Sequence, residues 1–204
     1  MRGLAGLALL MALAGCVPPP DVPPVLDLGA RSCADTPSPD AAAAAFIEPD
    51  GKMKFADVDN GSPCLRTAEG NSLYTAFRFA PGGPPAAAAI ASVALGRTMM
   101  APRIYVLDGA GKVAREIAAD SFLYRGGMLT TLLRLRPDDA AIVVASFPPA
   151  IGQAVSRIQS SVQQTTVQAG RGFFTWASGA EAGLQHTLAH NGRVRIELYR
   201  LPPQ

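Results

Sequence analysis

Histidine is the residue type best suited to metal binding or proton transfer, and the chain has two, His186 and His190. On a helix, the i, i+4 spacing would place both rings on one face, where they could share a zinc ion. On a strand, which rises about 3.3 Å per residue, the two lie about 13 Å apart and cannot share one. Asn191-Gly192 follows directly and favours a turn after a strand. We therefore predict no metal site and no cofactor.

Residue patterns for nucleophilic or dinucleotide chemistry are not found either. The sequence has no Gly-x-Ser-x-Gly elbow, and its acidic residues are scattered through turn-like segments. Gly109–Gly111 is a Gly-x-Gly between two expected strands rather than before a helix, so it indicates a turn. We predict that the protein is not an enzyme.

Cys33 and Cys64 are two of the three cysteines. In an oxidising compartment, such a pair forms a disulfide by default. Closing a loop of about thirty residues would stabilise the fold by roughly 3–4 kcal/mol on the chain-entropy model. A redox centre would need a Cys-x-x-Cys motif, which is not present. We predict a structural disulfide.

Cys16 ends the tetrapeptide Leu13-Ala14-Gly15-Cys16. Upstream lie Arg2 and the apolar run Leu4–Ala14, an arrangement typical of a secretory signal peptide. The tetrapeptide resembles the lipobox of bacterial lipoproteins, which implies cleavage before Cys16, a diacylglyceryl group on its sulfur and a third acyl chain on the new amino terminus. The apolar run would span only about 17 Å as a helix, short of a ~30 Å hydrocarbon core, so a transmembrane anchor is excluded.

Arginines and aromatic residues supply the remaining candidate binding groups. Arg134 and Arg136, and likewise Arg193 and Arg195, are spaced i, i+2, so each pair projects from one face of its strand. If those strands are neighbours, the four guanidiniums could hold phosphates or carboxylates; the alternative is a solvated outer face. Trp176, in a glycine-framed aromatic patch, could stack on a sugar ring or belong to the core.

The elements that must position these residues follow from punctuation along the chain. Residues 1–15 are the expected signal peptide, residues 16–45 a lipidated proline-rich tether, and residues 46–204 one domain. With Cys33 bridged, only Val17–Ser32 would remain as a free leash, reaching about 50 Å. Near-neutral charge, 17 basic and 16 acidic side chains after residue 15, argues against a nucleic-acid partner.

Past Lys54, short apolar stretches separated by turn residues predict an all-β, mainly antiparallel β-sandwich. Leu129, Leu133 and Leu135 are expected inside, as are Val194, Ile196 and Leu198. Expected hairpins join Arg103–Leu107 to Val113–Ile117, and Leu184–Ala189 to Val194–Leu201 through Asn191-Gly192. Expected buried strands are Ala86–Leu95 and Ala141–Phe147.

One segment changes period. In Ala150–Gln164, the residues Ile151, Val155, Ile158 and Val162 follow the spacing of one helical face. We therefore expect a short helix near residues 150–164, lying against the sheet, with a long polar loop as the alternative.

Several strand-and-turn stretches together resemble the maltose operon periplasmic protein family. They lie between about Asp57 and Gln164 and comprise Asp57–Pro63, Gly70–Arg78, Ala101–Asp108, Phe122–Tyr124, Leu133–Pro137 and Ile142–Val144. The resemblance implies a periplasmic protein linked to maltodextrin uptake through its operon. The chain departs from that family in carrying a lipobox and the Cys33/Cys64 pair.

The sequence therefore predicts a non-enzymatic bacterial envelope lipoprotein. It would be held to the membrane through the lipid on Cys16 and would have an accessory or assembly role, with an envelope protein as its partner. The alternative is a carbohydrate-binding module that takes an oligosaccharide. Because Val17 differs from the aspartate that resembles an inner-membrane retention signal, we expect the outer membrane, on its periplasmic side.

Overall fold

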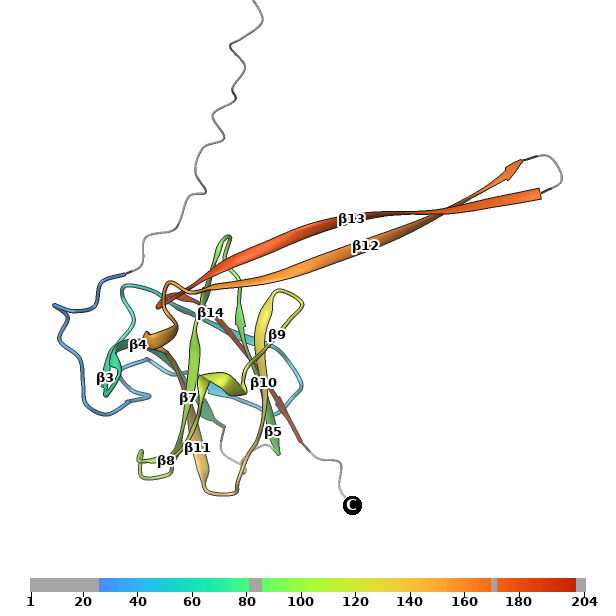
Figure 1. Cartoon of the computed structure of the whole chain (residues 1–204). Helices are drawn as coiled ribbons and strands as arrows, with labels where there is room; N and C mark the ends of the chain where they lie inside the picture. The colour runs from blue at the N-terminus through green and yellow to red at the C-terminus, as the bar shows by residue number, and fades with distance from the viewer. Residues whose placement is uncertain (1–25, 81–85, 170–171, 201–204) are drawn as a thin grey trace, which may run out of the picture.

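A computed structural model of the chain describes residues 26–80, 86–169 and 172–200, and these form an all-β fold (Figure 1). Two short 3-10 turns, η1 (Ala119–Ser121) and η2 (Pro148–Ala150), are the helical elements of this part of the chain. The strands are β1 (Phe46–Ile47), β2 (Lys54–Val58), β3 (Cys64–Thr67), β4 (Gly70–Phe79), β5 (Ala87–Val93), β6 (Thr98–Met100), β7 (Pro102–Asp108), β8 (Val113–Ile117), β9 (Leu123–Arg125), β10 (Met128–Arg134), β11 (Asp139–Ser146), β12 (Ala154–Ala169), β13 (Gly172–Ala189) and β14 (Gly192–Tyr199).

Two mainly antiparallel sheets make the body of the molecule. One has the order β1-β4-β11-β7-β8, with β3 paired to β4, and the other has the order β2-β14-β5-β10-β9. A third sheet, β12-β13-β6, is dominated by one hairpin. The predicted sandwich-like all-β class is confirmed, as are the β7–β8 hairpin and the buried strands β5 and β11.

The main core lies between the two large sheets. Ile142 and Val106 come from one sheet and Ile90 from the other, and each is at most 1% exposed. Alternation along β10 and β14 places the expected residues inside, namely Leu129, Leu133, Val194, Ile196 and Leu198, with Leu135 just beyond β10. Period-2 patterning thus identified the inward face of both strands correctly.

The six-stranded sheet is covered on its outer face as well. Tyr74 of β4 and Val143 of β11 belong to a second buried cluster, against which Ala42 and Ala44 pack. These two alanines belong to the segment Leu26–Ala45, which crosses this face and is here called the strap. The sheet is therefore buried on both faces, one of them by the protein's own N-terminal segment.

The predicted helix near residues 150–164 is wrong, because the chain there forms β12. Beyond η2, Gly152 adopts a positive φ of 84° that ends any helical turn, and β12 then pairs with β13. Val155, Ile158 and Val162 match a helical period, but they are β-branched and suit a strand equally well. Pairing with β13, more than ten residues away along the chain, selects the strand over the helix.

The predicted hairpin through Asn191-Gly192 is also wrong. β14 pairs with β2 and β5, whereas β13 pairs with β12 and β6, so the chain crosses between sheets at this point. A Cβ on Gly192 would lie 2.7 Å from the Met100 backbone nitrogen. Glycine is needed here for the close approach of β14 to β6.

Within residues 26–80, 86–169 and 172–200, we find no helix that is both long and apolar enough to cross a membrane.

Candidate functional site

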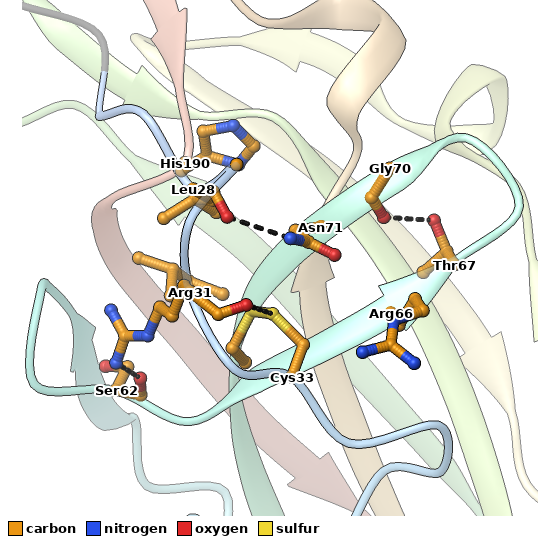
Figure 2. Close-up of a disulfide and its surroundings, with 12 residues drawn as sticks. Leu28, Arg31, Cys33, Ser62, Arg66, Thr67, Gly70, Asn71 and His190 are labelled. Carbon is orange, nitrogen blue, oxygen red and sulfur yellow. Dashed lines mark hydrogen bonds between the residues drawn. A yellow bond between two sulfur atoms is a disulfide. The ribbon is translucent and has the colours of Figure 1, made fainter.

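The predicted disulfide between Cys33 and Cys64 is present, and it fixes the strap to the start of β3 (Figure 2). The two Cα atoms lie 4.6 Å apart. Beside it, the Arg31 guanidinium donates to the carbonyl oxygens of Asn60 and Ser62, at 2.8 and 2.6 Å. The disulfide is thus one of several attachments between strap and body.

Further contacts hold the strap on either side of the disulfide. The Asn71 side-chain amide donates to the Leu28 carbonyl at 2.8 Å, and the Leu28 side chain is 5% exposed. The Tyr74 hydroxyl accepts from the backbone N–H of Ser38 at 3.1 Å, and Arg78 pairs with Asp40. The expected tether, residues 16–45, is therefore held against the domain from Leu26 onward, where Leu26 packs against the core.

A shallow pocket of about 360 Å³ lies between the strap and the body. Leu26–Gly29 form one wall, and Gly70, Asn71, Pro148 and His190 complete it. Its titratable ring, His190, contacts the Ser146 hydroxyl through Nδ1 at 2.8 Å, and that hydroxyl accepts from the Leu73 N–H at 3.1 Å. Burial lowers the pKa of His190, which favours the neutral ring.

Serine beside histidine is the pairing of a nucleophile and its base, but the geometry favours a structural role. The Ser146 hydroxyl is committed to two partners, and the residue is 1% exposed, so a substrate could not reach it. A serine nucleophile must present its hydroxyl to the bound substrate. The pair instead ties β11 to the end of β13.

His186 belongs to a separate contact. Its Nδ1 lies 3.1 Å from the Tyr124 hydroxyl, which joins β13 to β9 at the base of the hairpin. The strand prediction for His186 is confirmed, since it lies in β13. Among the described residues, no three His, Cys, Asp or Glu side chains gather closely enough to hold a metal ion.

The predicted cluster of four arginines depended on neighbouring strands, and β5 lies between the two strands concerned. Arg193 and Arg195 lie on β14, and β14 and β10 pair with opposite edges of β5. Arg193 is opposite Val93 whereas Arg134 is opposite Ala87, six residues or about 20 Å along that strand. Arg134, Arg193 and Arg195 share one sheet face, but the two pairs do not meet.

Each arginine has its own surroundings. Arg193 forms two hydrogen bonds with the Asp57 carboxylate, at 2.6 and 2.9 Å, and holds the pKa of Asp57 below its usual range. An Arg195 N–H points at the Met53 sulfur, 3.6 Å away. The Arg134 carbonyl accepts from Arg115. Arg136, beyond β10, donates its backbone N–H to Asp139.

Two candidate residues fall outside what the structure describes. Cys16 lies outside the described residues. The backbone of Trp176 is opposite Thr165 in the β12–β13 ladder, but its side chain lies outside the described part of the chain. Its predicted role stays a prediction.

The outer face of the β2-β14-β5-β10-β9 sheet, here called the open face, carries a group of exposed apolar side chains that the sequence did not reveal. Cross-strand register places four of its members on the face opposite the core: Phe55 (54% exposed), Leu123 (53%), Leu132 (71%) and Tyr199 (39%). The fifth, Met53 (53%), precedes β2, and its sulfur lies 3.6 Å from the Arg195 guanidinium on the same face. Between them, the outward residues of β5 are Ala87, Ala89, Ala91 and Val93, whose short side chains rise little above the backbone of the sheet. The sequence held one signal of this face: Leu132 is apolar, yet it occupies the outward position between Thr131 and Leu133, which face inward.

Charge on the open face is mainly positive. Arg125, Arg134, Arg193 and Arg195 occupy outward positions, against Asp57 and Glu197. Because Asp57 is taken up by Arg193, the excess falls on the other three arginines. The face therefore interleaves exposed apolar side chains with basic ones, since Arg195 of β14 lies between Phe55 of β2 and Ala91 of β5.

Comparison with known protein families finds no family model that matches the chain, and no curated protein matches it either.

Proposed function

We propose that this protein is a non-enzymatic bacterial envelope lipoprotein with an assembly role, and that the open face is where it docks a protein partner. The observation that carries the proposal is the set of five exposed apolar side chains on one face of one sheet. Single apolar side chains scattered over a protein surface are ordinary, whereas several that share one uncovered sheet face mark a candidate interaction site.

The contrast between the two outer faces supports the proposal. The strap covers the outer face of the six-stranded sheet, where Tyr74, Val143 and Leu107 are at most 1% exposed. No described segment of the chain covers Leu132, the most exposed large apolar residue, on the other sheet. A partner would therefore cover the open face, as the strap covers the outer face of the six-stranded sheet.

Charge indicates which partner fits. Arg125, Arg134 and Arg195 lie among the apolar residues of the open face, so the complementary surface is apolar with acidic groups interspersed. A folded envelope protein with such a patch is the partner we propose. An anionic lipid surface and an oligosaccharide are the competing occupants that the experiment must separate.

The compartment is proposed from the sequence. The signal peptide and the lipobox-like tetrapeptide ending at Cys16 support lipid anchoring at the periplasmic face of the outer membrane. The resemblance to the maltose operon periplasmic protein family supports an accessory role, linked to maltodextrin uptake, in the same compartment. Lipid and docking face together would hold a partner close to the membrane surface.

Position-specific photo-crosslinking in intact cells tests the docking face. A photoreactive residue at Leu132 should give a discrete protein adduct, and one at Val113, 46% exposed on β8 of the other sheet, should not. Arg125→Glu, which reverses the charge of one arginine on the open face, should reduce the yield of the Leu132 adduct at least several-fold. The matched change Val113→Glu should leave it unchanged.

Three results would overturn the proposal. Lipid adducts alone at Leu132 would assign the face to the membrane. Protein adducts of equal yield at Val113 would remove its specificity. A thermal midpoint raised by maltodextrins, and a Leu132 adduct lost when they are added, would assign the face to sugar binding.

A further inference from the structure

The hairpin β12–β13 extends well away from the two large sheets (Figure 1). Its strands pair without a break from Ala154 opposite Thr187 to Ala169 opposite Gly172, sixteen pairs with no register shift. At about 3.4 Å per residue, this antiparallel ladder is roughly 50 Å long. Beyond the short pairing of Thr187–Ala189 with β6, it is a two-stranded ribbon, and an isolated two-stranded hairpin is marginally stable in water.

Both long edges of the ribbon are open over most of their length. Among the described residues, β12 pairs only with β13, and β13 pairs additionally with β6 over just Thr187–Ala189. Along the outer edge of β12, alternate residues therefore direct backbone N–H and C=O groups away from any strand of the chain. Such an edge is a template for another strand.

Soluble proteins usually protect a long edge with proline, lysine, a bulge or a covering loop. The sequence of β12 contains no proline and no lysine, and its single charge is Arg157. β13 likewise has no proline and no lysine, and its carboxylate is Glu181. The absence of these devices over sixteen residues suits an edge that is used for pairing.

The geometry points to a second copy of this chain as the strand that pairs there. The free edge of β12 runs its full length, whereas β13 is already occupied at its base by β6. Two identical β12 edges can pair antiparallel about a two-fold axis, which closes the assembly at a dimer. We propose this dimer, with strand order β13-β12 of one copy followed by β12-β13 of the other.

Charge is compatible with that symmetry. With the axis at Ser161, which is then opposite its own copy, Arg157 of each copy is opposite Thr165 of the other, so no like charges meet. The lipid proposed at Cys16 would also confine both copies to one surface and raise their effective concentration.

Spin labels on single introduced cysteines test the pairing. The chain carries Cys16→Ser, so that the new thiol is the only one outside the Cys33–Cys64 disulfide. Ser161→Cys lies beside the axis and should give strong dipolar broadening between copies. Ser156→Cys is ten residues from its symmetry-related register position and should give a distance of roughly 34 Å.

A matched charge pair supplies the control. Ser161→Lys with Val162→Lys places two ammonium groups near the axis on each face of the four-stranded sheet and should abolish dimerisation, measured by sedimentation. Ala180→Lys with Gly179→Lys adds the same charge at the same height on β13 and should weaken the dimer much less. Leu132→Glu on the open face should leave the dimer unchanged, which separates this proposal from the proposed function.

A monomer at high protein concentration would overturn the proposal. So would broadening from labels on β13 with none from Ser161→Cys, because that pattern would mean that the β13 edges pair. Equal loss of dimer in both lysine variants would mean that a general charge effect, and not β12 pairing, controls association.

Discussion

At the scale of single residues, buried polar pairs rather than reactive groups surround both histidines. His190 shares a hydrogen bond with Ser146 and faces the shallow pocket beneath the strap, and His186 contacts Tyr124 at the base of the hairpin. Both histidines lie at a junction between two sheets. Each histidine thus connects elements that backbone pairing alone does not join.

His190 should make stability depend on pH. Burial depresses its folded-state pKa below the ordinary value of 6.5, so below about pH 6.5 the unfolded chain binds a proton that the folded chain resists. The contribution is fully present above that pH and is lost as the pH falls through and below it. His190→Asn keeps a hydrogen-bonding side chain beside the Ser146 hydroxyl and should flatten the fall in thermal midpoint between pH 7 and pH 5.

The comparison is between the pH slopes, since carboxylates shared by both proteins also titrate in this range. His186→Asn is the matched control for the other ring. A His190→Asn protein whose midpoint falls as steeply as the parent's would show that this ring titrates freely in the folded state.

At the scale of elements, alternation within a strand was predictable and pairing between strands was not. Leu133, Val194 and Ile196 were placed inside because period 2 is local and one face is buried. Strand order is not local: β5 separates β10 from β14, and no pattern in either strand indicates that. The arginine cluster failed for this reason.

The two wrong elements failed because of the same limit. Apolar spacing in Ala150–Gln164 fits a helix and a strand alike, and only pairing with β13 selects the strand. Asn191-Gly192 is a frequent hairpin turn, yet here Gly192 serves a close approach to Met100. The disulfide, by contrast, was predictable from cysteine counting, because it depends on chemistry and compartment more than on topology.

Adjacent leucines on β10 test the open face directly. Leu133 is 7% exposed in the core, and Leu132 is 71% exposed on the other side. Leu133→Ala should cost about 2–5 kcal/mol of unfolding free energy, because it leaves a cavity. Leu132→Ala should cost less than about 0.5 kcal/mol, as an uncovered surface position does.

Urea unfolding of the purified chain measures the change in unfolding free energy of both variants. The dependence on urea concentration and the baselines should be the same for the two. A large loss on Leu132→Ala in the monomer would mean that this side chain is buried by the protein itself, and the open face would then need no partner.

At the scale of the whole molecule, the strap would set how far the body lies from the membrane under the lipid anchor proposed at Cys16. Sequence alone placed the end of the free leash at Cys33, which gave a reach of about 50 Å. The structure moves the first attachment to Leu26–Leu28, since Leu26 packs against the core, the Leu28 side chain is buried and the Leu28 carbonyl accepts from Asn71. From Cys16 to Leu26 an extended chain would reach only about 31 Å.

Breaking the disulfide should therefore leave this reach unchanged, because the Leu28 attachment precedes Cys33 along the chain. The measurement is energy transfer from a dye on Val113→Cys to acceptors in a vesicle that holds the lipidated protein. Cys33→Ser with Cys64→Ser should keep the parent's transfer efficiency. Leu28→Ser with Asn71→Ala should lower it, since the leash then lengthens toward Cys33; the opposite ranking would show that the disulfide alone sets the reach.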